Sequence, residues 1–441
     1  MGWAPGRVAL FLGGILGLVG VHAAEPETNY DEGLVPAYTL PDPLKFSDGR
    51  IVRSAREWRR QRRAEVLELF RDQVYGHSPA PPAALRFVPV SEVRGALGGR
   101  AIRREVRVCF TGREDGPSMT VLLYLPQGST RPVPAFLGLN FKGNQGVTFE
   151  PDLPVTDRWV RNEPKEGRVN HRATEASRGT ESTRWPVADI LARGYALATV
   201  YYGDIEPDHV EGWRAGVRGV FPVDPARAVD PNATGFPLAD SDWGALGAWA
   251  WGLSRALDFL ETESRVDAQR VAVLGHSRLG KAALWAGAQD ERFAMVISNN
   301  SGEGGAALAR RVFGETTARI NALAPYWFCT NFKQYGHREA ELPVDQHELL
   351  ALMAPRPVYV ASAEKDLWAD PRGEFLAAQG AEPVYALFGK GGLGTAVWPR
   401  VNQPVGDFIG YHVRTGDHEV TLYDWNRYLD FADRHLKRRA R

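Results

Sequence analysis

The sequence predicts an α/β protein built around a doubly wound, mostly parallel sheet with long loop insertions. Short apolar runs of strand length alternate with helical patterns along most of the chain, which is typical of such sheets. One apolar run, 271–274, ends in a Gly-His-Ser turn that leads directly into a helical pattern. Two irregular, polar stretches at 147–184 and 205–240 interrupt the alternation, and loops of this length are usually functional or disordered.

The elements near the N-terminus are predicted from a helix-capping motif and from the alternation of apolar and polar residues. Residues 54–74 predict an amphipathic helix, because Ser54 can cap its N-terminus and Glu57 stands three residues later, as in a capping box. Residues 101–126 alternate between apolar and polar side chains and predict a β-hairpin.

The later elements follow from apolar runs of strand or helix length. We find no internal repeat and no low-complexity linker, so residues 25–441 are expected to form a single domain. Ligands of such sheets bind beyond the carboxyl ends of the strands. The expected strands are 134–138, 195–201, 271–274, 295–297, 357–362 and 384–388, and the expected helices are 187–193, 243–263, 281–288 and one starting near residue 424.

The net charge and the N-terminal segment indicate which binding partners and which cellular location to expect. The 53 Lys and Arg balance the 53 Asp and Glu, so the net charge gives no indication of a nucleic-acid-binding or polybasic membrane surface. Residues 1–24 combine one positive charge, an apolar segment and a small-residue cleavage site, which predicts a secretory signal peptide. An uncleaved N-terminal anchor is the alternative. We therefore expect a secreted or periplasmic monomer with no membrane contact after cleavage.

The sequence indicates no metal and no cofactor. No Cys/His spacing resembles a zinc site, and no H-E-x-x-H motif is present. The only cysteines, Cys109 and Cys329, stand in apolar surroundings. A disulfide and two buried free thiols are both compatible with export.

The turn at Ser277 is the clearest candidate for chemistry. A serine on a sharp strand-to-helix turn resembles the nucleophile elbow of the α/β-hydrolases, which presents the hydroxyl above the sheet next to the first amides of a helix. The usual pattern is G-x-S-x-G. Here Leu279 stands where the second glycine is expected and Gly280 follows it, so a purely structural turn is the alternative.

A serine nucleophile needs a base in hydrogen-bond reach, and the base needs an orienting acid. In α/β-hydrolases the chain order is serine, acid, histidine. His418, in a polar loop before the last helix, is the predicted base, with His412 as the alternative. Asp366, in the loop after the apolar run 357–362, is the predicted acid.

Two motifs carry a family resemblance. Residues 275–281 (GHSRLGK) and 299–307 (NNSGEGGAA) resemble the glucuronoyl esterases, carbohydrate esterase family 15. The likeness extends over nearly the whole chain after the signal segment, and the long insertions look like those of bacterial members. Supporting stretches are 40–44 (LPDPL), 184–186 (RWP), 201–205 (YYGDI) and 326–328 (YWF).

The resemblance implies a serine esterase that cleaves the ester between 4-O-methyl-glucuronate of glucuronoxylan and alcohols of lignin, through an acyl-enzyme on Ser277. His418 would take the serine proton and return it to the leaving alcohol. Arg278 would help hold the oxyanion through its amide and guanidinium, in line with the physics of developing negative charge. The implied contacts to the substrate are Lys281, Glu315, Trp368 and Glu303.

Two departures from the family pattern matter. His276 stands where fungal members carry a disulfide-forming cysteine, so that bridge is absent. Asn300 stands where many members carry the acid of the triad, and an amide cannot stabilise an imidazolium by charge. This favours Asp366 as the acid, with Glu303 as the alternative. An acetyl xylan or feruloyl esterase, and a catalytically silent carbohydrate-binding homologue, remain competing functions.

Overall fold

The computed structural model describes residues 28–224 and 239–437. The signal segment predicted at residues 1–24 lies outside the described residues, as does part of the second polar stretch. No helix in the described ranges has the length and apolar character needed to span a bilayer. Cys109 and Cys329 are both buried free thiols.

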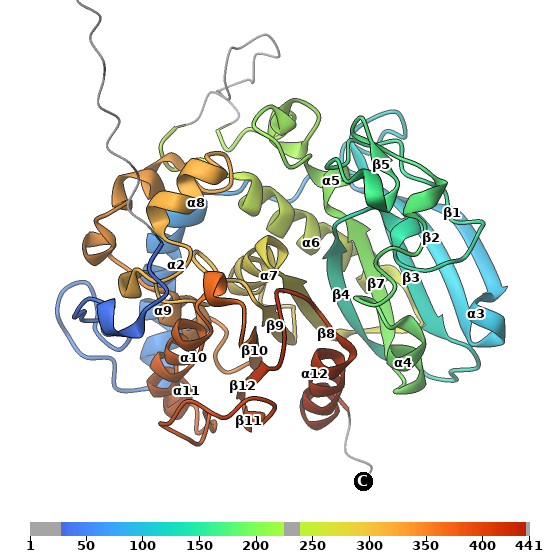
Figure 1. The fold of residues 1–441 in the computed structure, drawn as a ribbon. Helices are drawn as coiled ribbons and strands as arrows, with labels where there is room; N and C mark the ends of the chain where they lie inside the picture. Colours follow the sequence, from blue (N-terminus) through green and yellow to red (C-terminus); the bar gives the residue numbers. More distant parts are fainter. Residues whose placement is uncertain (1–27, 225–238, 438–441) are drawn as a thin grey trace, which may run out of the picture.

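One ten-stranded sheet runs through the molecule in the order β1-β2-β3-β7-β4-β8-β9-β10-β12-β11 (Figure 1). Neighbours from β7 to β12 are parallel, whereas β1, β2, β3 and β11 pair antiparallel at the two edges. The mostly parallel sheet predicted from the alternation is therefore present. The strands are β1 Arg86–Gly95, β2 Ala101–Cys109, β3 Ser118–Pro126, β4 Val133–Asn140, β7 Ala196–Tyr201, β8 Val266–His276, β9 Met295–Asn299, β10 Val358–Ala363, β11 Val405–Gly406 and β12 Ile409–Arg414.

Helices cover both faces of this sheet, and β8 shows how the sequence divides them. Its alternate residues Val271 and Val273 pack into one core, whereas Ala272 and Leu274 pack into the other. The first core contains α2, α6, α7, α9, α10 and α11, and the second contains α4 and α12 (Figure 1). Helices of six or more residues are α2 Arg63–Phe70, α4 Val187–Ala192, α6 Ala245–Thr262, α7 Arg278–Gln289, α8 Thr317–Leu323, α9 Gln346–Ala351, α10 Pro371–Gly380, α11 Glu382–Leu387 and α12 Leu422–His435.

The N-terminal predictions agree with the structure. Ser54 accepts a hydrogen bond from the Glu57 amide, and helical turns continue to Tyr75. The hairpin 101–126 is β2 paired with β3, with Val106 opposite Val121. The first polar stretch includes the short strands β5 (Arg168–Val169) and β6 (Arg172–Ala173), which pair antiparallel.

The strand expected at 384–388 is wrong, because these residues form α11. A short apolar run fits a strand or a buried helix equally well, and Pro383 near the helix N-terminus favours the helix. The strand that pairs with β10 across the sheet from β9 is instead β12, and its six residues are all buried. Gly410 and His412 made this segment look like a loop. The edge strand β1 was not predicted either.

The carboxyl ends of β8, β9, β10 and β12 meet at one edge of the sheet. Ser277 follows β8, Asn300 follows β9, Asp366 lies three residues after β10, and His418 lies four residues after β12. The topology alone therefore gathers these four residues, which are far apart in sequence.

Candidate active site

The turn after β8 holds Ser277 in a backbone conformation that L-residues seldom adopt, with φ 56° and ψ −132°. Its amide donates to the carbonyl of Asn299 at 2.9 Å. A Cβ on Gly275 would lie 1.9 Å from the Leu279 carbonyl oxygen, so the turn requires glycine there. Helix α7 begins at Arg278, and the first amides of a helix have no partner within it. The strand–turn–helix context of a nucleophile elbow is therefore present.

The displaced second glycine has a packing explanation. The Leu279 side chain is buried in the core under α7, so a large apolar residue is accommodated at this position. A Cβ on Gly280 would lie 3.1 Å from both the Gly275 carbonyl oxygen and the Ser301 Cβ. The close approach of α7 to the loop after β9 therefore occurs one residue later than in the usual pattern.

His418 and Asp366 form a hydrogen-bonded pair beside the serine. His418 Nδ1 lies 2.6 Å from Asp366 Oδ2, and since a carboxylate only accepts, Nδ1 is the donor. Asp366 is buried, whereas the His418 side chain is 39% exposed. The pair thus leaves His418 Nε2 as the nitrogen available to act on a serine proton.

Asn300 completes this arrangement from the position where many family members carry an acid. Its Nδ2 donates to the same Asp366 Oδ2 at 2.6 Å, and its amide donates to the Ala361 carbonyl at 2.7 Å. Its φ of 47° lies in the left-handed region, which asparagine tolerates better than most residues. Asn300 therefore orients the predicted acid and carries no charge of its own.

Ser277, Asp366 and His418 open onto a cleft of about 470 Å³, which we call the main cleft. Its walls combine donors, acceptors and apolar surface, as a sugar derivative requires. Its other lining residues include Arg161, Asp208, Arg278, Lys281, Asn300, Glu315, Tyr326, Trp327 and Trp368.

Arg278 is fixed against one wall of this cleft. Its guanidinium donates to Asp208 and lies over the Trp327 ring, 4.9 Å from the centroid. Tyr326 Oη and Trp327 Nε1 donate to the other oxygen of Asp208, at 2.9 and 2.8 Å. Burial alone lowers the pKa of Arg278, but the Asp208 carboxylate outweighs it and the pKa lies above its usual value. Arg278 therefore stays charged beside Ser277.

Lys281 has a different environment from the one expected. Its ammonium donates to the Ser301 carbonyl at 2.6 Å, to the Glu303 carbonyl, and to Glu315 Oε2 at 2.7 Å. These three bonds use all of its hydrogens, so it supports the cleft wall and has none left for a sugar hydroxyl. Glu315 Oε1 accepts in turn from Trp368 Nε1 at 3.1 Å, which fixes both side chains at the cleft surface.

The expectation that Glu303 contacts substrate or replaces Asp366 is corrected by the structure. Its carboxylate accepts from Thr317 Oγ1 at 2.6 Å, it is buried, and it does not belong to the cleft lining. Burial raises its pKa well above the usual value. Its spacing from Asn300 suggested proximity to His418, but the turn after β9 directs the side chain toward α8.

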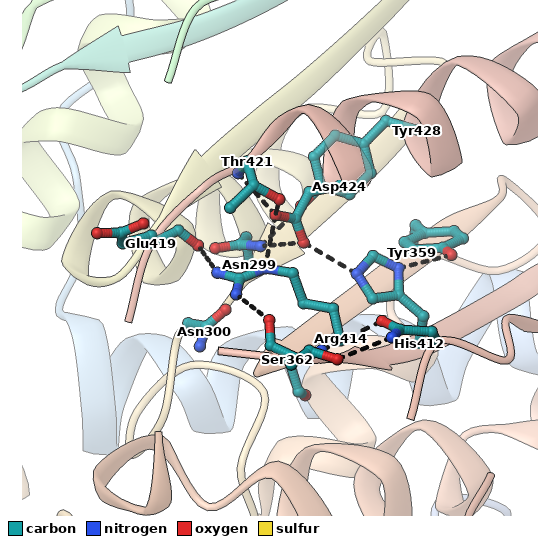
Figure 2. Close-up of polar contacts among 12 residues, drawn as sticks. Asn299, Asn300, Tyr359, Ser362, His412, Arg414, Glu419, Thr421, Asp424 and Tyr428 are labelled. Carbon is teal, nitrogen blue, oxygen red and sulfur yellow. Dashed lines mark hydrogen bonds and ion pairs between the residues drawn. The ribbon is translucent and has the colours of Figure 1, made fainter. Parts of the chain in front are cut away.

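The alternative base, His412, lies in β12 and is completely buried. Its Nε2 lies 2.9 Å from Asp424 Oδ1 and its Nδ1 lies 2.9 Å from Tyr359 Oη (Figure 2). Both nitrogens are therefore occupied away from the cleft. Burial lowers the pKa of His412, which favours the neutral ring.

Asp424 and Arg414 form a buried ion pair that supports the His418 loop (Figure 2). Arg414 Nε donates to Asp424 Oδ2 at 2.8 Å. Its two terminal nitrogens donate to the backbone carbonyls of Thr415 and Asp417, both at 2.9 Å, and to that of Glu419. We call these bonds the Arg414 clamp. They fix the backbone on both sides of His418.

Asp424 is held ionised by its neighbours. Burial by itself raises its pKa, but the hydrogen bond from His412 and the charge of Arg414 lower it below the usual value. The amide and hydroxyl of Thr421 also donate to Asp424 Oδ2, at 2.7 and 2.8 Å. The same carboxylate therefore caps α12 and anchors the clamp.

Two buried side chains, His276 and Glu374, contact the residues that form the site. The His276 ring packs against His418 at 4.5 Å between centroids, and burial, Arg184 and His418 together hold its pKa well below the usual range. The Glu374 carboxylate accepts from the amides of Ser301 and Gly302 at 2.8 and 3.1 Å. Burial raises the pKa of Glu374 to about 8.

Several supporting residues could not be identified from the sequence. Asp208 lies in the second polar stretch, where no pattern distinguishes it from other acids. Arg414 acts through backbone carbonyls, which leave no motif, whereas Thr421 and Asp424 have the spacing of a capping box that marks the start of α12. Within the described ranges, one group could gather three metal ligands, Glu68, Asp72 and His77, and none of these lines the main cleft.

Comparisons with known proteins point to one family of esterases. The family model described as glucuronyl esterase of fungi matches residues 236–389. Carbohydrate esterase MZ0003, from an unknown prokaryotic organism, is 49% identical over 416 residues, covering 94% of each chain.

Two solved structures are similar over the whole fold. A glucuronoyl esterase from Solibacter usitatus is 49% identical with a TM-score of 0.85, covering 92% of this chain and all of that one. A promiscuous esterase of carbohydrate esterase family 15, from a marine bacterial metagenome, has the same identity and TM-score and covers 93% of this chain and all of that one. The fold is that of the α/β-hydrolases, and the chain belongs to the glucuronoyl esterases of carbohydrate esterase family 15, which are carboxylic ester hydrolases.

Proposed function

We propose that this protein hydrolyses the ester between 4-O-methyl-glucuronate of glucuronoxylan and alcohols of lignin, through an acyl-enzyme on Ser277. The observation that carries the proposal is the His418–Asp366 hydrogen bond of 2.6 Å, at the edge of the cleft that Ser277 also lines. This pair supplies a base with a fixed tautomer next to a serine on a nucleophile elbow.

The first half of the reaction forms the acyl-enzyme. His418 Nε2 takes the Ser277 hydroxyl proton while the serine oxygen attacks the ester carbonyl carbon. The negative charge that develops on the carbonyl oxygen is stabilised by the amides at the start of α7 and by the Arg278 guanidinium. When the tetrahedral intermediate collapses, His418 gives its proton to the leaving alcohol oxygen and the carbon–oxygen bond to the alcohol breaks.

The second half of the reaction hydrolyses the acyl-enzyme and restores the free enzyme. His418 takes a proton from water, the water oxygen attacks the acyl carbon, and collapse of the second intermediate releases the uronate and restores the Ser277 hydroxyl. Asp366 accepts the hydrogen bond from His418 Nδ1 and stabilises the imidazolium. Asn300 supports it through the hydrogen bond from Nδ2.

The main cleft suits the glucuronate arm of the ester. Trp368 provides an apolar ring for a sugar face, and Glu315 provides acceptors for sugar hydroxyls. Lys281 positions Glu315 rather than binding the sugar itself. Because the polymer substrate is extracellular, we also propose that residues 1–24 direct export of the chain.

The test is hydrolysis of a benzyl ester of glucuronic acid by the wild type and three variants. Turnover that disappears in Ser277→Ala and falls steeply in Asp366→Ala, while Asn300→Ala loses far less than Asp366→Ala, supports both the activity and the assigned acid. A wild type that hydrolyses acetyl or feruloyl esters instead would overturn the substrate. The similarity to an esterase described as promiscuous makes these esters the appropriate comparison.

A further inference from the structure

A second cavity adjoins the serine, and Trp368 does not belong to its lining. It has a volume of about 220 Å³ and shares Ser277, Arg278, Arg161 and His418 with the main cleft. An ester bound at Ser277 has two arms that diverge from the carbonyl carbon. Two cavities that meet at the nucleophile can therefore each receive one arm, with His418 between them to protonate the leaving oxygen.

The lining of this second cavity is cationic. Among the described residues it includes no carboxylate, and its charged side chains other than the two histidines are Lys142, Arg161, Arg168, Arg184 and Arg278, with Phe141 and Tyr202 as aromatic walls. We call it the basic pocket. Lysine and arginine only donate hydrogen bonds, so the group that best satisfies this lining offers acceptors and carries negative charge.

This lining distinguishes the two arms. A sugar presents hydroxyls that donate as well as accept, and the main cleft offers Glu315 and Asp208 as acceptors. The basic pocket offers no comparable acceptor. The glucuronate arm therefore fits the main cleft, and the alcohol arm is left for the basic pocket.

Most of the cations in the basic pocket are already neutralised. Lys142 and Arg168 both pair with Glu166, at 2.8 and 2.6 Å, and Arg184 pairs with Glu181 at 3.0 Å. Arg278 pairs with Asp208, as described above.

Arg161 is different. Its guanidinium makes no hydrogen bond or ion pair to any residue that the structure describes, and the residue is exposed where the two cavities meet. Its backbone is nevertheless fixed, because Arg168 Nη1 donates to its carbonyl at 3.1 Å and Val160 beside it is buried. Arg161 therefore has, within the described ranges, an unpaired guanidinium on a backbone that is held in place, and it lines a cavity whose charged side chains only donate hydrogen bonds. This position allows it to bind an anionic group of a ligand.

We infer that the basic pocket receives the alcohol arm of the substrate and that Arg161 selects alcohols that carry a carboxylate. This inference rests on the proposed ester hydrolysis and specifies the class of leaving group: an aromatic or aliphatic alcohol with an acidic substituent. The carboxylate pairs with Arg161 and takes no part in the bond changes.

The experiment compares three glucuronate esters whose alcohols differ only in charge: 4-carboxybenzyl, 4-carbamoylbenzyl and 4-(aminomethyl)benzyl. In the wild type we expect kcat/KM for the carboxybenzyl ester to exceed that for the neutral carbamoyl ester by about two- to fivefold, since an ion pair near the surface contributes modestly. The cationic ester should be the poorest substrate. The preference should shrink in 0.5 M salt, because screening weakens exposed pairs.

Variants then assign the preference to one residue. Arg161→Gln should bring the ratio of carboxybenzyl to carbamoylbenzyl close to one, and Arg161→Lys should keep part of it. Arg172→Gln is the matched control, because it removes an exposed cation from the same insertion but outside both cavities, and it should leave the ratio unchanged.

The outcomes separate the two proposals. Equal kcat/KM for the charged and neutral esters, or a preference that survives in Arg161→Gln, overturns the inference while leaving the esterase proposal intact. Failure of the wild type to hydrolyse any of the three glucuronate esters overturns the proposed function and the inference together.

Discussion

Two histidine–aspartate pairs lie on either side of the end of β12, and they behave in opposite ways. His418 and Asp366 are 2.6 Å apart, and the histidine side chain is 39% exposed at the cleft. His412 and Asp424 are 2.9 Å apart, and both side chains are completely buried. Each pair contains a histidine and an aspartate that could orient it, as in a catalytic triad, so the pairing alone does not identify the catalytic histidine.

The difference lies in the second nitrogen of each ring. His418 binds its acid through Nδ1, which leaves Nε2 without a partner among the described residues, on a side chain that lines the same cleft as Ser277. His412 binds its acid through Nε2 and uses Nδ1 on Tyr359, so no nitrogen remains for a substrate. The buried pair instead supports the exposed one, because Asp424 anchors the Arg414 clamp on the His418 loop. One pair therefore has a structural role and the other is available for chemistry.

Asp366→Asn is the substitution that we expect to have the largest effect on catalysis. An asparagine keeps the shape of the side chain but cannot stabilise the imidazolium and allows the wrong tautomer, so kcat should fall by about 10³–10⁴-fold. Steady-state hydrolysis of the benzyl ester measures this loss. Asp417→Asn, one residue before His418, makes the same change in charge without touching the pair and should keep wild-type turnover. Retention of more than a tenth of kcat by Asp366→Asn would contradict the assignment of the acid.

The same substitution in the buried pair should act on stability. Asp424→Asn leaves Arg414 without its counter-charge in the interior, which costs about 3–5 kcal/mol of unfolding free energy. Urea denaturation of the variant measures this cost. Because the clamp also loosens, kcat of the folded variant should fall while KM changes little.

A matched control lies on the same helix. Asp430→Asn removes an exposed carboxylate from α12 and should change the unfolding free energy by less than about 1 kcal/mol. If Asp424→Asn were equally mild, the buried pair would not be the support of the loop that its hydrogen bonds indicate.

The sequence predicted the exposed pair more successfully than the buried one, for a physical reason. The order of serine, acid and histidine, together with apolar runs that end at one edge of a sheet, predicted that Ser277, Asp366 and His418 lie at the same edge, and all three line one cleft. The elbow is local, so its glycine and helix could be recognised from adjacent residues. The parallel core was predictable for the same reason, since buried strands are continuous apolar runs.

Contacts made through the backbone left no comparable pattern. Arg414 binds carbonyls, which every residue has, and β12 was hidden because Gly410 and His412 interrupt its apolar character. Lys281 and Glu303 were expected in the cleft because they follow Ser277 and Asn300 closely. Lys281 does line the cleft, but its ammonium is occupied by two backbone carbonyls and Glu315, whereas the Glu303 side chain turns into the interior. Only the packing of α7 against the loop after β9 determines these directions.

A third prediction concerns the support of that loop by Glu374. Its pKa is raised to about 8 by burial, from an unfolded value near 4.5. Between these values the folded state holds a proton that the unfolded state releases, so the contribution of Glu374 to stability falls as pH rises from about 5 to 8. Glu374→Gln has no proton to lose, and its stability relative to the wild type should rise by on the order of 3 kcal/mol over that window. Urea denaturation at several pH values measures the difference, and two parallel curves would contradict it.

The smallest expected effect is at Asn300, which shares Asp366 Oδ2 with His418. Removing the amide costs one hydrogen bond to the acid, so kcat should fall about two- to tenfold, far less than in Asp366→Asn. Asn300→Ala also places a Cβ-bearing residue other than asparagine at φ 47°, which strains the turn. Asn300→Gly removes the amide without that strain. Equal losses of kcat in the two variants would assign the effect to the hydrogen bond, because only a backbone effect would separate alanine from glycine.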